Sequence, residues 1–156
     1  MLGPSREIPR AVRLLKGDDS VAIAEVGPVC VVIWRGAVTE APFELQRAAL
    51  ARVVDRNPGT AGMLCIVENS AKPPGDKLRS ASTDMITRHG TNLKCLGCVI
   101  EGTGFMTAVH RGALAGMVLL LRNKKTSVSI FATNFPSCDL NSRPPGGTVI
   151  SLPGGA

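Results

Sequence analysis

The chain alternates between short apolar runs, typical of strands, and stretches in which apolar residues recur at helical spacing. Two β-branched runs, at 21–26 and 29–35, are separated by Gly27-Pro28, a turn signal that predicts an antiparallel hairpin. Continuous apolar runs predict two more strands at 63–67 and 96–100, and alternating, then continuous apolar residues predict a last strand at 127–132. Because such runs suit strands that are covered on both faces, 63–67 and 96–100 are expected deep in the sheet.

Three helices are predicted between these strands. The first follows Thr39, a residue that can cap a helix, and ends at Asn57-Pro58-Gly59; its apolar positions are Leu45, Ala49, Leu50, Val53 and Val54. The second follows 72–76 and ends at His89-Gly90; its inward positions are Leu78, Ala81, Met85 and Ile86. The third helix is predicted over 105–121.

This order predicts an α/β fold with one mixed sheet, in which a β-hairpin is followed by α-β-α-β-α-β. Strands that are separated by single helices are parallel and are joined by right-handed crossovers. The α/β domain is expected to span 21–135. Residues 1–20 show only a short apolar stretch and are expected to form an N-terminal arm, whereas the density of Pro and Gly predicts an irregular or disordered C-terminal tail at 136–156.

Composition narrows the class of protein. With 156 residues and 44% apolar residues, the chain is long and apolar enough for one folded domain. The N-terminus has no secretion signal, and no apolar run approaches the roughly 20 residues of a membrane span, so we expect a cytoplasmic protein. The net charge of +6 allows an anionic partner. One Trp, four Phe and no Tyr offer few stacking surfaces, which does not favour a nucleic-acid partner.

Charged residues follow three of the predicted strands. Arg35, Glu68 and Glu101 each stand where a strand ends, and Gly102 and Gly104 follow the last of them. Because ligands of parallel sheets meet the carboxyl ends of strands, these five residues are a candidate pocket for a small molecule or anion. The alternative is that each strand simply ends at its first solvated charge.

No motif in the sequence predicts catalysis. Cys95-Leu-Gly-Cys98 begins a strand, where residues three apart point to opposite faces, so neither a reactive thiol pair nor a metal site is expected. No nucleophile elbow, metalloprotease or phosphate-loop motif is present. We therefore expect no catalytic residue, metal or cofactor, and predict that the protein is not an enzyme.

The predicted third helix has a stripe of small residues. Ala108, Gly112 and Gly116 fall four apart, and the following segment, which includes Met117 and Leu120, is apolar on every side. Because such a helix has no polar face, it must be buried on two sides. Either the sheet and the tail cover it, or a second subunit does, in which case the protein is a homodimer and could act as a dimeric scaffold.

The order of strands and helices resembles that of STAS domains, the class of bacterial anti-sigma-factor antagonists and their SpoIIAA-like relatives. The resemblance spans 21–132. It includes Trp34-Arg-Gly-Ala-Val-Thr39 as a strand and helix entry, and Leu96-Gly-Cys-Val-Ile100 as a central strand. In these antagonists a phosphorylatable serine follows the strand that matches 63–67, at a helix N-terminus, and a kinase recognises it. Ser70 occupies the matching position.

The resemblance implies a regulatory role in bacterial signal transduction. We therefore expect a non-catalytic module that binds a protein, such as a kinase or an anti-sigma-like regulator, and that is switched by phosphorylation. The residues expected at the contact are Glu68, Asn69, Ser70, Lys72 and Lys77. The chain departs from the family in lacking its Asp-Ser-Ser-Gly type motif, and Lys72-Pro-Pro-Gly lengthens the loop. A serine that merely satisfies a turn is the alternative for Ser70.

Overall fold

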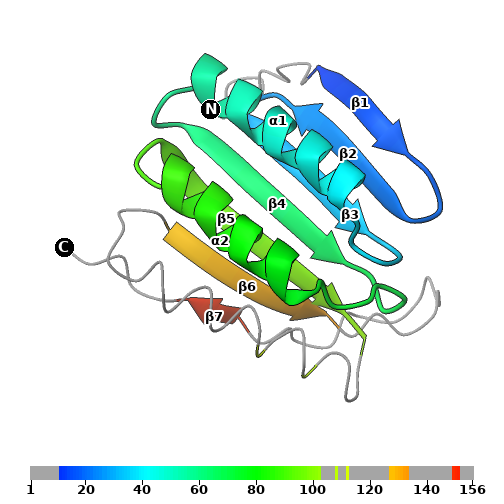
Figure 1. Cartoon of the computed structure of the whole chain (residues 1–156). Helices are drawn as coiled ribbons and strands as arrows, with labels where there is room; N and C mark the ends of the chain where they lie inside the picture. Colours follow the sequence, from blue (N-terminus) through cyan, green and yellow to red (C-terminus); the bar gives the residue numbers. More distant parts are fainter. Residues whose placement is uncertain (1–10, 103–107, 109–111, 113–126, 134–148, 152–156) are drawn as a thin grey trace, which may run out of the picture.

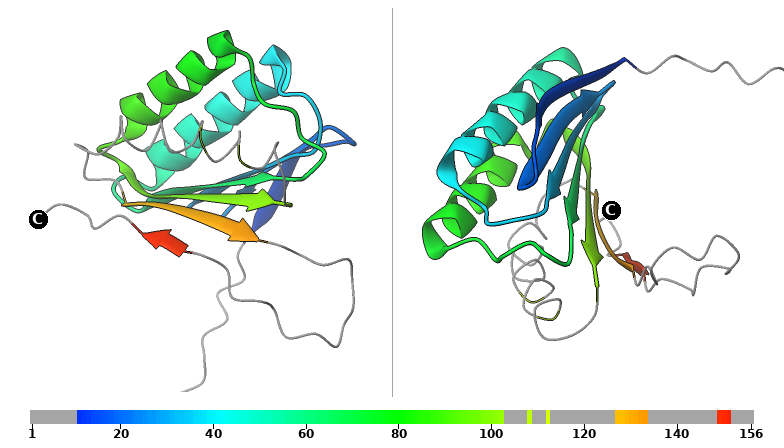
Figure 2. Two further views of the ribbon diagram at one scale, coloured as in Figure 1. Left: turned by 90° about the horizontal axis from the view of Figure 1, so that it is seen from below. Right: turned by 90° about the vertical axis from the view of Figure 1, so that its right-hand side faces the viewer.

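The fold is a single mixed β-sheet with both described helices on one of its faces (Figures 1 and 2). The computed structural model of the chain describes residues 11–102, 108, 112, 127–133 and 149–151. In this part the sheet has seven strands, and their order in space is their order in sequence. The strands are β1 Val12–Gly17, β2 Val21–Val26, β3 Val29–Trp34, β4 Ala61–Val67, β5 Leu93–Glu101, β6 Ser127–Thr133 and β7 Val149–Ser151.

The strand directions confirm the predicted class of sheet. β2 and β3 form the antiparallel hairpin, and β3, β4, β5 and β6 are parallel neighbours. The first two predicted helices are present as α1 Glu40–Arg56 and α2 Asp76–His89. The third predicted helix lies outside the described residues except at Ala108 and Gly112, which are helical.

Strand β1 corrects the prediction of an arm at 1–20. It pairs antiparallel with β2, so that Arg13 lies opposite Glu25 at the edge of the sheet. An edge strand needs few buried side chains, and in β1 only Leu15, next to a bulge, packs against the core, while Val12 is 68% and Leu14 66% exposed. The sequence of β1 therefore lacks the apolar run by which the inner strands were predicted.

Strand β7 corrects the predicted irregular tail in the same way. Residues Val149–Ser151 pair antiparallel with β6. Three residues suffice for an edge strand between segments rich in Pro and Gly, and so short a run carries no clear periodicity. The rest of 136–156 contains no other described residue.

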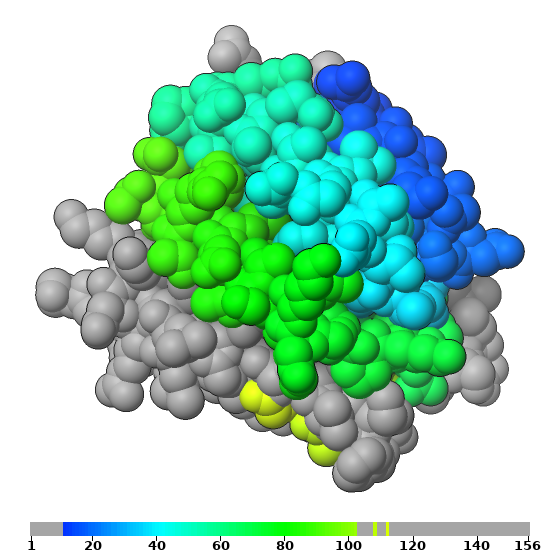
Figure 3. Space-filling view, viewed as in Figure 1, coloured from blue at the N-terminus to red at the C-terminus, as the bar shows by residue number. Residues whose placement is uncertain are grey.

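The core lies between the helices and the sheet face that they cover. In the space-filling view from the helix side, α1 and α2 lie side by side over the sheet (Figure 3). The predicted inward positions of both helices are buried or pack against the core, which confirms their periodicity. Thr39 precedes α1 in extended conformation, as an N-cap does, but its side chain makes no capping hydrogen bond. The largest fully buried side chains include Ile23, Leu50, Leu93 and Ile100.

Candidate functional site

The carboxyl ends of β3, β4 and β5 lie side by side. Trp34 is in register with Val67, and Val67 with Ile100. The three charged residues that follow these positions are Arg35, Glu68 and Glu101. They therefore lie next to one another at the carboxyl ends of the inner strands. Because β4 pairs directly with β5, Glu68 and Glu101 end neighbouring strands.

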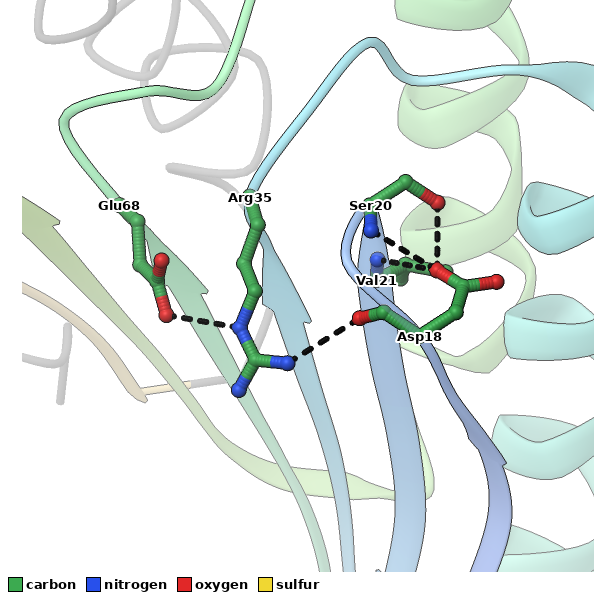
Figure 4. A network of polar contacts seen from close by, with 5 residues as sticks. All are labelled: Asp18, Ser20, Val21, Arg35 and Glu68. Carbon is green, nitrogen blue, oxygen red and sulfur yellow. Dashed lines mark hydrogen bonds and ion pairs between the residues drawn. The ribbon is translucent and has the colours of Figure 1, made fainter.

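Arg35 is held between two loops (Figure 4). Its Nε donates to Oε1 of Glu68 at 3.0 Å, and its Nη1 donates to the backbone oxygen of Asp18 at 3.2 Å. The two side chains of the ion pair are 36% and 31% exposed. The carboxylate of Glu68 therefore already balances the charge of the Arg35 guanidinium within the chain.

The turn between β1 and β2 gives Arg35 its second acceptor. One carboxylate oxygen of Asp18 accepts hydrogen bonds from the backbone of Ser20 at 2.8 Å, the hydroxyl of Ser20 at 2.6 Å and the backbone of Val21 at 3.0 Å. Lys16 and these Ser20 and Val21 groups hold the pKa of Asp18 well below its usual range. A charged Asp18 therefore fixes the turn whose backbone oxygen receives Arg35.

The loop after β4, residues 68–75, is fixed by its backbone. The backbone amide of Glu68 donates to the backbone oxygen of Trp34 at 2.9 Å, and that of Lys72 donates to the backbone oxygen of Gly36 at 3.1 Å. Between them the side chain of Ala71 is buried at 3% exposure. Asn69, Ser70 and Lys72 are exposed. The loop thus presents polar side chains on a backbone that is held to the end of β3.

Gly102, directly after β5, lies close to the same loop. Its φ is +96°, and a Cβ there would collide with the side chain of Asn69. Glycine is required at this position because only it combines this backbone conformation with such a close approach. Of the candidate pocket, the structure brings Arg35 and Glu68 into contact and places Glu101 and Gly102 at the same edge; Gly104 lies outside the described residues.

The position of Ser70 differs from the one that the resemblance implied. Helix α2 begins at Asp76 after an N-cap at Gly75, so Ser70 does not stand at its N-terminus. The reason is Pro73-Pro74, since a residue before proline is disfavoured in helical conformation. Lys77, in the first turn of α2, instead forms an ion pair with Glu40 at the start of α1, which raises the pKa of Lys77 and lowers that of Glu40.

The cysteines confirm one prediction and add a pair that the sequence did not reveal. Cys95 is exposed and lies beside Gly62, whereas Cys98 is buried and in register with Cys65, so the two cysteines of the motif do point to opposite faces. A hydrogen bond with Cys65, together with burial, raises the pKa of Cys98. Burial, followed by the charge of Glu25, raises the pKa of Cys30 to about 12. Only the strand register, which no sequence motif encodes, brings Cys65 and Cys98 together.

Alkylation should separate these thiols. At pH 8 iodoacetamide is expected to modify Cys95 before Cys30 and Cys98 and to leave these two largely unmodified in the folded chain. A pKa of about 12 in place of 9.0 leaves Cys30 with about a thousandth of the ordinary thiolate, which is the reactive form. Peptide mass spectrometry over time measures the rates, with the chain in urea as the control in which all thiols react. Equal rates at Cys30 and Cys95 in the folded protein would refute this assignment.

The described residues contain neither a metal cluster nor a membrane helix. Within this part of the chain, no group of three or more His, Cys, Asp or Glu side chains could hold a metal ion. None of the described helices has the length and apolar character needed to cross a bilayer.

Of the predicted dimer helix, Ala108 and Gly112 are exposed, and a Cβ at Gly112 would meet nothing within 4 Å. Gly116, Met117 and Leu120 lie outside the described residues.

Comparisons with known proteins give no family for the chain. No protein-family model matches it, and neither the curated proteins nor the solved structures contain a match. The functional argument therefore depends on the residues of the site itself.

Proposed function

We propose that this chain is a non-catalytic regulatory module that binds another protein through loop 68–75 and the first turn of α2. The observation that carries the proposal is the contrast within this loop. Its backbone is held by hydrogen bonds to β3 and by buried Ala71, while Asn69, Ser70 and Lys72 are exposed. A surface whose backbone is already ordered loses little conformational entropy on binding.

The charges of this surface favour a protein partner over a small anion. Arg35 is the most enclosed cation at the edge, and it is already paired with Glu68. Lys77 is paired with Glu40. Among the described residues, no carboxylate lies within ion-pair distance of Lys72, so this exposed ammonium group is available for a carboxylate of a partner. The small-molecule pocket and the dimeric scaffold remain predictions of the sequence that no contact among the described residues favours.

Ser70 is the residue through which such a surface would be switched. It is exposed, and a phosphate on it would add roughly 1.5 to 2 negative charges between Glu68 and Lys72. In this proposal the phosphate acts at the contact itself rather than through the N-terminus of α2, which begins six residues later at Asp76. A kinase or an anti-sigma-like regulator is the class of partner that the STAS resemblance implies.

The test compares partners captured by matched variants. The chain and its variants are used as bait in lysate of the source organism, and bound proteins are quantified by mass spectrometry. Ser70→Glu and Lys72→Glu are each expected to reduce a stoichiometric partner about ten-fold, since reversing or adding a charge at a contact costs more than 1 kcal/mol. Thr91→Glu and Lys94→Glu make the same charge changes at exposed positions before and at the start of β5, and should retain it.

Two outcomes would overturn the proposal. One is a partner that the loop variants and the control variants retain equally, because the contact would then lie elsewhere. The other is the absence of any stoichiometric partner. Circular dichroism of each variant checks that the fold is intact.

A further inference from the structure

A second charged cluster lies around a buried carboxylate under α1, at the opposite end of β3 from Arg35. Glu25 on β2 has a side chain that is only 6% exposed. Its Oε1 accepts a hydrogen bond from Nε of Arg52 at 2.9 Å, and its Oε2 accepts one from Nη1 of Arg56 at 3.1 Å. Nη1 of Arg13 lies 3.9 Å from the same Oε2. We call these three arginines the arginine cluster.

The fold fixes the arginine cluster from two directions. Arg13 is the register partner of Glu25 on the edge strand β1. Arg52 and Arg56 are four residues apart on α1, and so share one face of that helix, which packs over β2. The buried carboxylate thus has three guanidinium groups around it, from a strand and a helix, and holds two of them by hydrogen bonds.

The cluster has more positive charge than Glu25 can balance. Three arginines face one carboxylate, which leaves a local charge of about +2 at neutral pH. Their side chains are 60%, 37% and 59% exposed for Arg13, Arg52 and Arg56. Each guanidinium carries five N–H donors. Glu25 accepts one N–H from Arg52 and one from Arg56, so most N–H donors of the cluster have no acceptor among the described residues.

Other described carboxylates near α1 are engaged elsewhere. Glu44 is paired with Arg47. The charge of Asp55 acts on His89, where it opposes the lowering of the histidine pKa by burial and by Arg88, and Asp55 forms no ion pair with the arginine cluster in the described part of the chain. The excess charge of the arginine cluster is therefore not balanced by another described acid.

We propose that the arginine cluster is a binding site for the dianion of a phosphate monoester. Two negative charges match the excess of the cluster, and phosphate oxygens accept paired hydrogen bonds from guanidinium groups. Glu25 holds Arg52 and Arg56 in place before the ligand arrives, which lowers the ordering cost of binding. The site is separate from loop 68–75 and does not depend on the function proposed for that loop.

A purely structural role would explain the same contacts differently. Arg52 and Arg56 would then serve only to satisfy the buried carboxylate of Glu25, and Arg13 would have no role. The two accounts differ in what removal of Arg13 does: it changes phosphate affinity in the first and changes nothing measurable in the second. Arg13 has the longest contact with Glu25, so its loss disturbs the fold least.

The experiment titrates the full chain with inorganic phosphate at fixed ionic strength by isothermal titration calorimetry. Saturable binding at one site is expected, and Arg13→Gln and Arg56→Gln should each weaken it about ten-fold, since each removes charge-assisted hydrogen bonds. Arg47→Gln is the matched control, because it removes the same charge from an exposed position of α1 and should leave the affinity unchanged. Adenosine 5′-monophosphate and a phosphoserine peptide are titrated in parallel to distinguish a small-molecule source of the phosphate from a phosphoprotein.

Three results would overturn the proposal. The first is no saturable binding of any of the three probes. The second is an Arg47→Gln variant that loses as much affinity as Arg13→Gln, which would mean that only net charge matters. The third is phosphate binding that Arg13→Gln and Arg56→Gln leave unchanged. Thermal unfolding of each variant shows that the loss of binding is not a loss of fold.

Discussion

Replacing Gly102 with alanine is expected to lower the free energy of unfolding by about 2–4 kcal/mol, through two separate causes. A non-glycine residue is strained at a φ of +96°, and the new Cβ would collide with the side chain of Asn69. Because Asn69 belongs to loop 68–75, the variant also shifts one exposed side chain of the surface proposed to bind a partner. Urea denaturation followed by circular dichroism measures the loss.

Gly59 supplies the matched control. Its φ is +73°, but a Cβ there would meet nothing within 4 Å, so Gly59→Ala should show the strain alone, about 1 kcal/mol. Adding Asn69→Gly to Gly102→Ala should recover the part of the loss that comes from the collision. Equal losses for Gly102→Ala and Gly59→Ala, with no recovery in the double variant, would show that the loop does not pack against Gly102.

The Arg52→Met variant is expected to lose about 2 kcal/mol of stability. It keeps most of the apolar stem of the side chain but removes the closest partner of the buried Glu25 carboxylate, at 2.9 Å. Breaking a buried ion pair from one side costs about 3–5 kcal/mol, and the 37% exposure of Arg52 and the remaining contact with Arg56 reduce this figure. Equilibrium unfolding in urea measures the change.

Two further variants separate burial from general charge loss. Arg47→Met, in an exposed pair with Glu44, should change the stability by less than about 0.5 kcal/mol. Adding Glu25→Met to Arg52→Met should restore much of the loss, because apolar residues often replace a buried ion pair without cost. A double variant less stable than Arg52→Met alone would contradict the assignment of Glu25 as the buried charge.

The inner strands and both described helices could be predicted from the sequence because each leaves a periodic or a continuous apolar pattern. The alternation in β2 and β3 and the helical spacing of Leu50 and Met85 reflect burial on one face. The edge strands β1 and β7 were not predicted, since an edge needs little buried surface. Within α1, Phe43 and Gln46 are also buried, but Gln46 is polar and gave no such signal.

The candidate site was predictable as far as it depends on strand ends. Arg35 and Glu68 follow neighbouring parallel strands, and this alone places them together. The Cys65–Cys98 pair and the arginine cluster around Glu25 depend instead on register and on the packing of α1, which a single sequence does not specify. Pro73 and Pro74 set the distance from Ser70 to α2. In the sequence they indicated a longer loop, but not the residue at which the helix begins.

Hydrogen–deuterium exchange of the full chain, alone and with the partner captured in lysate, tests the proposed function most directly. The partner is expected to slow exchange across residues 68–77, where the loop and the first turn of α2 lie. Exchange in segments away from this loop, such as β1, is expected to stay unchanged. Slowed exchange confined to other segments, such as β1, with residues 68–77 unaffected, would contradict the account.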